Sequence, residues 1–240
     1  MLFRSVPKGS GLGTSSILAG ACVKALFEFT GTEYKEDDLY AHVLAMEQLM
    51  STGGGWQDQV GGLSNGIKLI SSDKGINQII NVEHLKLRKD TLNELNDRFA
   101  LIYTGQRRLA RNLLRDVVGR YIGNETDTLY ALKEIQNVAL EMKDALINDD
   151  IDEFAILLSR HWDLSKMIDE GSSNPLIDEI FRSIDDLIDG RMVCGAGGGG
   201  FLQTVLKKNI RKKDLQNRLK EVFPDSGIEV WDCEIIQENE

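Results

Sequence analysis

The chain has 240 residues, 42% of them hydrophobic and 28% charged, and its formal net charge is −10. This composition is ordinary for a globular protein of one large or two smaller domains. The negative charge argues against nonspecific binding to nucleic acid or to an anionic membrane surface, and no apolar run approaches the ~20 residues of a membrane span.

The N-terminal stretch, MLFRSVPKG, lacks the apolar segment of a signal peptide. The three cysteines, Cys22, Cys194 and Cys233, are scattered and form no CxxC pair. Such a set is typical of buried thiols in a reducing compartment rather than of a disulfide framework or a zinc site. We therefore expect a cytoplasmic protein.

A glycine-rich segment, PKGSGLGTSS, occupies residues 7–16 and precedes a helix predicted over 15–29. Glycine lets a ligand approach the backbone closely, and the start of a helix offers unpaired N–H groups and a positive dipole end. The combination is typical of a phosphate site. The alternative is a flexible surface turn with a Ser or Thr cap. The candidate residues are Lys8 for its charge, Gly9, Gly11 and Gly13 for their backbone, and Thr14, Ser15 and Ser16 for hydroxyls that could hold phosphate or Mg²⁺.

A second helix is predicted over 37–50, with Gly31 ending the first helix and Asp37 as the N-cap of the second. Glu47 falls near its C-terminal end, where an acidic side chain opposes the helix dipole. That placement is a mild indication of a metal or cationic partner. The alternative is a solvated side chain, because Glu47 lies on the less apolar side of the helix.

The segment GGGWQDQVGG, at 53–62, is expected to be a glycine-rich loop. Asp58 stands in it between two glutamines. A carboxylate in such a loop can face a substrate hydroxyl or a metal ion, and the alternative is an ordinary turn-forming aspartate.

The rest of the chain alternates short β-like runs with long helical patterns, which gives the class α+β. A polar run around 84–97 separates a β-rich segment from a helical half, and no internal repeat occurs. The predicted strands are 66–71, 76–87, 99–105, 191–194, 201–207 and 227–236; the predicted helices are 92–96, 107–119, 126–148, 150–169, 175–189 and 212–223.

The glycine run at 195–200 matches GxGxxG, the fingerprint of a dinucleotide site. That interpretation requires a helix after the glycines. The following residues, FLQTVL, alternate like a strand, so the match is rejected as a NAD site.

Phosphate-binding glycines, hydroxyls and carboxylates together favour phosphoryl transfer, whose catalysis rests on positioning and charge stabilisation. PKGSGLGTSS resembles the second signature of the GHMP kinases, and GAGGGGF resembles their third. GGGWQDQVGG is similar to the sugar-kinase form of their catalytic-aspartate segment. It is most like the L-fucokinases, including the kinase half of bifunctional fucokinase/GDP-fucose pyrophosphorylases. LIYTGQRRLARNLLRDVV and HWDLSKMID resemble that subfamily too, so the likeness runs along nearly the whole chain in order.

The resemblance implies a role for each matching residue. The loop around the ATP phosphates would comprise Gly9, Ser10, Gly11, Leu12, Gly13 and Thr14, with Lys8 and Ser16 beside it. Ser15 and Glu47 would bind Mg²⁺. Asp58 would orient, and in the stronger version deprotonate, the anomeric hydroxyl of a sugar, with Gly55 and Trp56 beside the substrate; for Trp56 a place in the core is the alternative. The supporting third-signature loop would contain Gly195, Gly197, Gly198 and Gly199.

The implied fold is a two-lobed GHMP kinase, with the N-terminal ATP-binding domain over 1–90 and a ferredoxin-like C-terminal domain over 91–240. Because only MLFRSV precedes the second signature, the N-terminal lobe is expected to be incomplete, with exposed apolar surface where strands would dock. The implied cofactors are ATP and Mg²⁺, and the implied partners are small molecules, with no nucleic acid and no membrane. Oligomeric state is left open.

The resulting hypothesis is an ATP-dependent sugar kinase, or a fragment of one, that converts L-fucose to fucose 1-phosphate. The alternatives are a heptose-phosphate kinase of the same superfamily and a non-catalytic nucleotide- or sugar-binding module.

Overall fold

The computed structural model describes residues 6–7, 9–50, 54–75, 79–106 and 111–237, with only the backbone of 111–115. The chain divides into two compact units. The larger comprises Met1–Leu12 and Lys86–Ile236, and the smaller comprises Gly13–Leu85 and Gln237–Glu240. The chain passes from one unit to the other inside the glycine-rich segment, between Leu12 and Gly13. The domain division expected from the sequence, at residues 90 and 91, stays a prediction.

The larger unit is built on a four-stranded antiparallel sheet of order β4-β5-β3-β6. Relative to chain order this is 2-3-1-4, the arrangement of the ferredoxin-like βαββαβ fold. The mixed α+β class predicted from the sequence is confirmed. The strands are β3 (Phe99–Tyr103), β4 (Ile188–Val193), β5 (Phe201–Leu206) and β6 (Glu229–Trp231).

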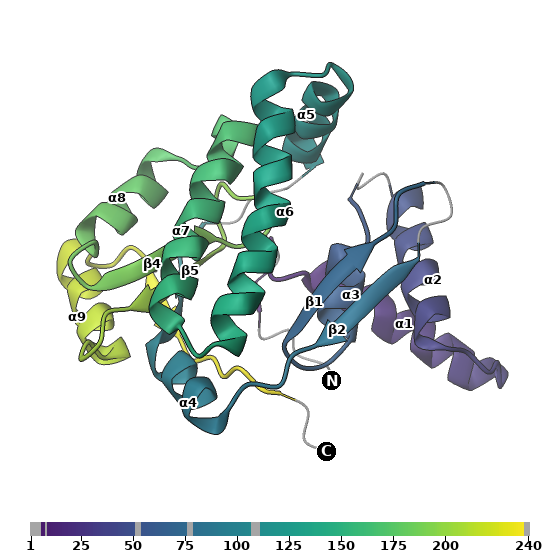
Figure 1. Ribbon diagram of the computed structural model, residues 1–240, viewed down its shortest axis with the longest axis horizontal. Coiled ribbons are helices and arrows are strands. Elements are labelled where there is room, and N and C mark those ends of the chain that lie inside the picture. Colours follow the sequence, from purple (N-terminus) through teal and green to yellow (C-terminus); the bar gives the residue numbers. More distant parts are fainter. Residues whose placement is uncertain (1–5, 8, 51–53, 76–78, 107–110, 238–240) are drawn as a thin grey trace. The chain divides into compact units, whose positions relative to one another are not determined.

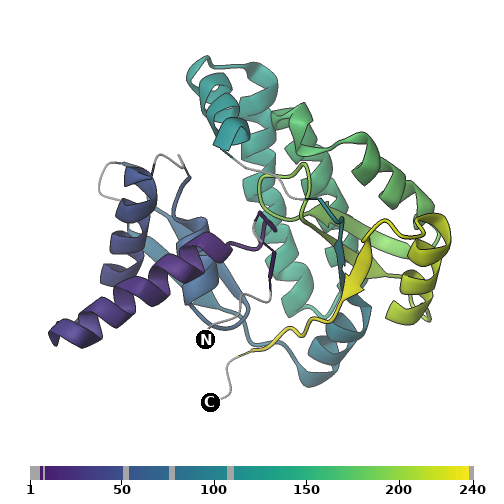
Figure 2. The ribbon, with the colours of Figure 1, turned by 180° about the vertical axis from the view of Figure 1, so that it is seen from behind.

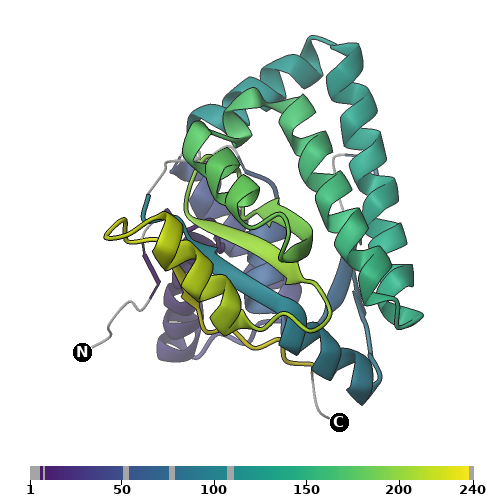
Figure 3. The ribbon, with the colours of Figure 1, turned by 90° about the vertical axis from the view of Figure 1, so that its left-hand side faces the viewer.

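Two helices, α8 (Pro175–Ser183) and α9 (Lys212–Val222), cover one face of this sheet, as Figure 3 shows. Their apolar residues recur every three or four positions, so one stripe of each helix is buried. The resulting core includes Ile180 and Leu215 from the helices and Ile102 and Leu202 from the strands, all fully buried. Figure 2 shows β6 in yellow at the free edge beside β3.

The long helices form a separate layer of the same unit, visible in Figure 1. The connection between α6 and α7 is short, so the two helices pack as neighbours around a second apolar cluster that includes Val138 and Leu157. The helices of this layer are α5 (Arg111–Ile122), α6 (Thr126–Ile147) and α7 (Ile151–Ile168), and α4 (Lys89–Arg98) precedes β3.

Helix α7 lies directly against the edge strand β4. A Cβ added to Gly190 would come within 2.5 Å of the carbonyl oxygen of Ala155, so glycine at this position permits the approach. The N–H of Arg191 donates to Ser159 Oγ at 3.1 Å. The helix thereby covers backbone donors that an open sheet edge would leave unpaired.

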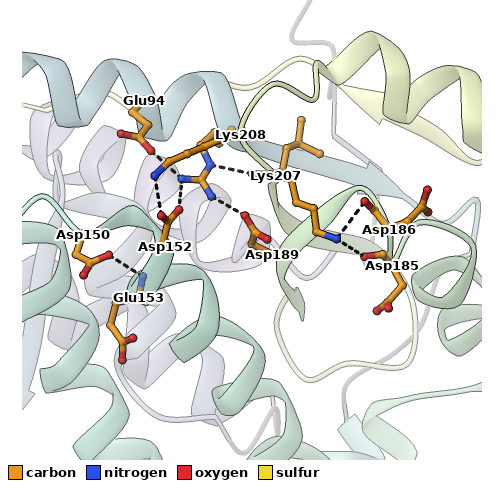
Figure 4. Close-up of polar contacts among 11 residues, drawn as sticks. Glu94, Asp150, Asp152, Glu153, Asp185, Asp186, Asp189, Lys207 and Lys208 are labelled. Carbon is orange, nitrogen blue, oxygen red and sulfur yellow. Dashed lines mark hydrogen bonds and ion pairs between the residues drawn. The ribbon is translucent and has the colours of Figure 1, made fainter.

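A buried guanidinium ties four elements of the larger unit together. Arg98, only 4% exposed, donates from Nε to the carbonyl of Leu206 and from Nη1 and Nη2 to Glu94, Asp152 and Asp189, at 2.7–2.9 Å. Figure 4 shows these carboxylates converging, with Lys208 also paired to Asp152. Hydrogen bonds from Lys208 and Arg98 hold the pKa of the Asp152 carboxyl below its usual value.

The smaller unit packs three helices beside a two-stranded antiparallel sheet, in which Lys68 pairs with His84 and Ser72 with Ile80. Its core includes Ala19, Leu39 and Val43. Its elements are α1 (Thr14–Thr30), α2 (Glu36–Leu49), α3 (Gln57–Leu63), β1 (Lys68–Ser72) and β2 (Ile80–His84).

Several details of the predicted helices, strands and cysteines are wrong. The helix predicted over 175–189 ends at Ser183, because Asp185 and Asp186 would oppose the dipole at its C-terminal end and instead pair with Arg191 and Arg218. The last strand is three residues long, since Asn96 binds the backbone of Ile235 beyond it.

The second helix begins at Glu36 rather than after Asp37, because the Asp38 carboxylate accepts the N–H of Lys35 and fixes the helix start there. The expectation of three buried thiols also fails. Cys194 is buried, but Cys22 is exposed on α1 and Cys233 is intermediate, and all three are free. None of the described helices is both long and apolar enough to cross a membrane.

We predict that Gly190→Ala destabilises the protein by about 1–3 kcal/mol, the usual cost of overpacking, because the new methyl group would collide with the backbone of α7. Gly119→Ala is the control. Gly119 lies inside helix α5, and an added Cβ would have no atom within 4 Å. This substitution should therefore raise the free energy of unfolding by up to ~1 kcal/mol. Urea unfolding curves measure both. Equal effects of the two changes would contradict the packing of α7 against β4.

Candidate active site

The chemistry-bearing residues of the smaller unit gather around the carboxylate of Glu47. This side chain is 8% exposed, although it lies near the end of α2 and the sequence left open that it is solvated. Ser15 Oγ donates to Glu47 Oε1 at 2.9 Å, and Ser16 Oγ donates to both oxygens at 3.0 and 3.1 Å. Gln59 Nε2 donates to Oε2. Helices α1, α2 and α3 thus meet at one buried negative charge.

The catalytic-aspartate segment is a helix and not the predicted glycine-rich loop. Trp56 stands at the N-cap of α3, and Asp58 lies in its first turn. The glycines serve a contact between helices: a Cβ on Gly62 would lie 2.7 Å from Ile17 Cγ1, and one on Gly20 would meet Leu63. Close packing of α1 on α3 therefore explains glycines that the sequence pattern attributed to a loop.

The helical geometry also sorts the two glutamines beside Asp58. Gln57 is exposed, whereas Gln59 is 1% exposed and faces Glu47. Its Oε1 is buried without a hydrogen-bond partner among the described residues. Sequence reasoning missed this residue, because the difference between the two glutamines appears only once the segment is helical.

Asp58 remains accessible and lies close to the start of α1. A Cβ built on Gly13 would be 3.7 Å from Asp58 Cγ. Surrounding protein raises the pKa of the Asp58 carboxyl by desolvation, and the negative charge of Glu47 raises it further. Both effects favour the protonated form and make the ionised carboxylate a stronger base.

Helix α1 begins at Thr14 with Gly13 as its N-cap, at φ 60°, and no side chain caps it. The alternative of a Ser or Thr cap is therefore wrong. No acidic residue lies in the first turn. The positive end of the helix thus has no carboxylate of its own first turn beside it, and the carboxylates near it are Glu47 of α2 and Asp58 of α3.

In the larger unit, the first part of the glycine segment packs against the loop between β4 and β5. A Cβ on Gly11, which has φ +80°, would meet the carbonyl of Cys194, and one on Gly195 would lie 2.9 Å from Gly11 Cα. The N–H of Phe201 donates to the carbonyl of Ser10 at 3.0 Å. Strand β5 follows the glycines, as predicted, and the dinucleotide fingerprint lacks the helix it needs.

The structure also places the other residues of the predicted site. Ser10 is buried, and its Oγ accepts the N–H of Leu12 at 3.3 Å. Gly197 approaches the backbone of Ser172, and the N–H of Gly198 donates to the carbonyl of Ser172 at 2.6 Å. The remaining ones are Gly9 and Thr14, half-buried; Gly55, exposed; Gly199, buried; and Lys8, which lies outside the described residues.

The pair Ser15 and Glu47 fits a magnesium ion. Adjacent ligands of octahedral Mg²⁺, each bound at 2.0–2.1 Å, are separated by about 2.9 Å. The Ser15 and Glu47 oxygens are 2.9 Å apart, so both could bind one ion once the Ser15 hydroxyl turns its proton away from Glu47. In the described part of the chain, no three His, Cys, Asp or Glu side chains cluster for a metal, so phosphate oxygens and water would complete the shell.

Comparison with known proteins identifies this arrangement. The GHMP kinases N terminal domain matches residues 2–66, and the GHMP kinases C terminal domain matches residues 142–225. The chain belongs to the GHMP kinases.

Two curated relatives combine two activities in their names. The bifunctional fucokinase/GDP-fucose pyrophosphorylase of Arabidopsis thaliana is 40% identical over 90% of this chain, and the L-fucokinase/L-fucose-1-P guanylyltransferase of Bacteroides fragilis is 37% identical over 86%. The matched regions cover only 21% and 22% of those proteins.

A solved phosphomevalonate kinase of Streptococcus pneumoniae, complexed with phosphomevalonate and AMPPNP, shares the fold. Its TM-score is 0.74 at 17% identity, covering 95% of this chain and 70% of that one. The GHMP kinase fold expected from the sequence is thereby confirmed.

We predict that Gly11→Ala weakens ATP binding at least tenfold, because the methyl group would collide with Cys194 and displace the glycine segment. Gly31→Ala is the matched control, since Gly31 also has positive φ, +68°, but an added Cβ meets nothing within 4 Å. It should lower stability and leave ATP affinity unchanged. Calorimetric titration with ATP distinguishes the two, and equal affinities for both variants would argue against a phosphate site at this loop.

Proposed function

We propose that this GHMP kinase transfers the γ-phosphoryl group of ATP to the anomeric hydroxyl of a monosaccharide, and that the sugar is L-fucose. The observation that carries the proposal is the Glu47 cluster at the uncapped start of α1, with Asp58 beside it. The likeness to two fucokinases at 40% and 37% identity supports the choice of sugar.

In this mechanism the backbone of Gly9–Gly13 and the start of α1 hold the ATP phosphates. The N–H groups at the start of the helix would donate to phosphate oxygens. They would stabilise the negative charge that develops on these oxygens during phosphoryl transfer. Lys8 supplies a further positive charge. Ser15 and Glu47 would hold Mg²⁺, which when bound neutralises charge on the phosphates. Ser16 and Gln59 keep the Glu47 carboxylate in one orientation by hydrogen bonds.

Asp58 accepts a hydrogen bond from the anomeric hydroxyl and aligns its oxygen with the γ-phosphorus. As the new O–P bond forms and the bond to the β-phosphate oxygen breaks, the hydroxyl proton passes to the Asp58 carboxylate and later to solvent. The raised pKa of Asp58 makes it the better proton acceptor. Gly55 and Trp56, at the start of α3, would contact the sugar.

Two alternative functions, a heptose-phosphate kinase and a non-catalytic binding module, differ from this proposal in the substrates that the protein would turn over. A heptose-phosphate kinase would consume ATP with a phosphorylated heptose and not with L-fucose. A non-catalytic module would bind nucleotide or sugar with no turnover. Release of ADP and of sugar 1-phosphate, followed over a panel that includes L-fucose, D-galactose and a heptose phosphate, decides among them.

Asp58→Asn should lower kcat by about 10²–10⁴, the usual contribution of general-base catalysis, while ATP affinity stays within a factor of two or so. The amide is nearly isosteric but cannot accept the proton. Asp37→Asn, in the exposed first turn of α2, is the control and should keep wild-type kcat. Normal turnover in Asp58→Asn would remove this residue from the mechanism, and a collapse of ATP affinity would make it a support of the phosphate site.

A further inference from the structure

The sheet of the larger unit ends in a strand with one free side. Strand β6 pairs with β3 on one side, and the described part of the chain places no further strand on the other, as Figure 2 shows. A strand at the edge of a sheet presents N–H and C=O groups that can pair with a strand of another molecule. The groups that cover this edge therefore decide whether the sheet can extend.

The N–H of Val230, in the middle of β6, is bound by a side chain. It donates to Oε1 of Gln216, on helix α9, at 2.9 Å, although Val230 lies directly opposite Ile102 of β3. In an antiparallel pair, the N–H and C=O of one residue point to the same side of its strand. Both backbone groups of Val230 thus point to the free side, and Gln216 covers the donor.

Other side chains protect the same edge. The N–H of Ile228, two residues before Val230, donates to Ser226 Oγ at 3.2 Å. The exposed side chains along the segment include the acidic Glu229, Asp232 and Glu234. Charges of one sign on an edge strand repel the same segment of a second molecule. Covered donors and negative charge therefore both oppose extension of the sheet.

The Gln216 amide gains little stability from this contact. Only its carbonyl oxygen can accept the N–H of Val230, so Nε2 is turned away from it. Nε2 is buried and has no hydrogen-bond partner among the described residues. A buried donor without an acceptor is costly, and this cost offsets the gain from the bond to Oε1. An apolar side chain would avoid the buried donor, so local stability does not explain a glutamine at this position.

We propose that Gln216 protects the free edge of the sheet, because its amide occupies the Val230 N–H and prevents β6 from pairing with β6 of a second copy of this chain. Without that amide, two copies can pair antiparallel about Val230, with each Val230 N–H donating to the C=O of the other. The two sheets would then become one. The inference concerns the sheet edge and does not depend on the proposed kinase activity.

The test replaces the Gln216 amide by an apolar side chain. Gln216→Leu removes both the acceptor for Val230 and the buried donor, so its Tm should stay within a few degrees of the wild-type value. Self-association is measured by sedimentation equilibrium in about 0.5 M NaCl, which screens the acidic side chains of the edge. We expect the dissociation constant of the dimer to fall about tenfold or more, which is the contribution of two new hydrogen bonds.

Asn217→Leu is the matched control. Asn217 is the next residue of α9 and is exposed, so this variant adds an apolar side chain to the same helix without uncovering Val230. Its self-association should equal that of the wild type. Because each variant is compared with the wild type, association through exposed apolar side chains elsewhere cancels.

A second variant distinguishes strand pairing from nonspecific apolar association. Val230→Pro, added to Gln216→Leu, removes the N–H that would pair with the second copy and keeps the pairing with β3, because that N–H does not face β3. The double variant should return to wild-type self-association. Hydrogen exchange gives the same information without proline: in Gln216→Leu, exchange of the peptide that contains residues 229–231 should slow as the protein concentration rises.

Three results would overturn the inference. The first is a dimer dissociation constant for Gln216→Leu equal to that of the wild type. The second is equal association of Asn217→Leu and Gln216→Leu, since an added apolar side chain on α9 would then suffice. The third is association of Gln216→Leu with no change of exchange at 229–231, because the new contact would then lie away from β6.

Discussion

The smaller unit depends on one buried negative charge. Removing a carboxylate from water is expensive unless hydrogen bonds replace its hydration. Glu47 receives them from two serines of α1 and a glutamine of α3. Because those donors come from different helices, the charge fixes how α1, α2 and α3 meet. Its position in turn sets the distance to the Ser15 hydroxyl and contributes to the raised pKa of Asp58. The same interaction therefore organises both the fold and the proposed chemistry.

Much of the fold follows from local sequence patterns. The helical spacing of apolar residues predicted α1, α6, α7 and α9, and alternation predicted β3 and β5, to within a few residues. The prediction failed where a local signal was determined by a distant partner. Gly61 and Gly62 resembled loop residues, yet both lie in α3, where the missing side chain of Gly62 leaves room for Ile17. Asp185 and Asp186 were predicted to continue a helix to residue 189, because their pairing with Arg191 and Arg218 forms only in the folded chain.

The candidate site divides in the same way. The glycines and hydroxyl residues of the first segment and Asp58 of the second lie in recognisable sequence motifs, so they could be predicted as site residues from the sequence. Gln59 has no such signal. It gains its contact to Glu47 from the turn of α3. The burial of a side chain and its contacts with distant residues cannot be derived from residue spacing in the sequence.

The Arg98 network affects local unfolding within the larger unit. One guanidinium binds groups at residues 94, 152, 189 and 206, which belong to or adjoin α4, α7, β4 and β5. Were any one of them to detach, the buried cation would lose a partner that the others cannot replace. Fraying of a single element is thereby discouraged, and amide hydrogen exchange in these segments becomes a property of one cooperative opening rather than four local ones. The contacts of one side chain thus favour the opening of α4, α7, β4 and β5 together.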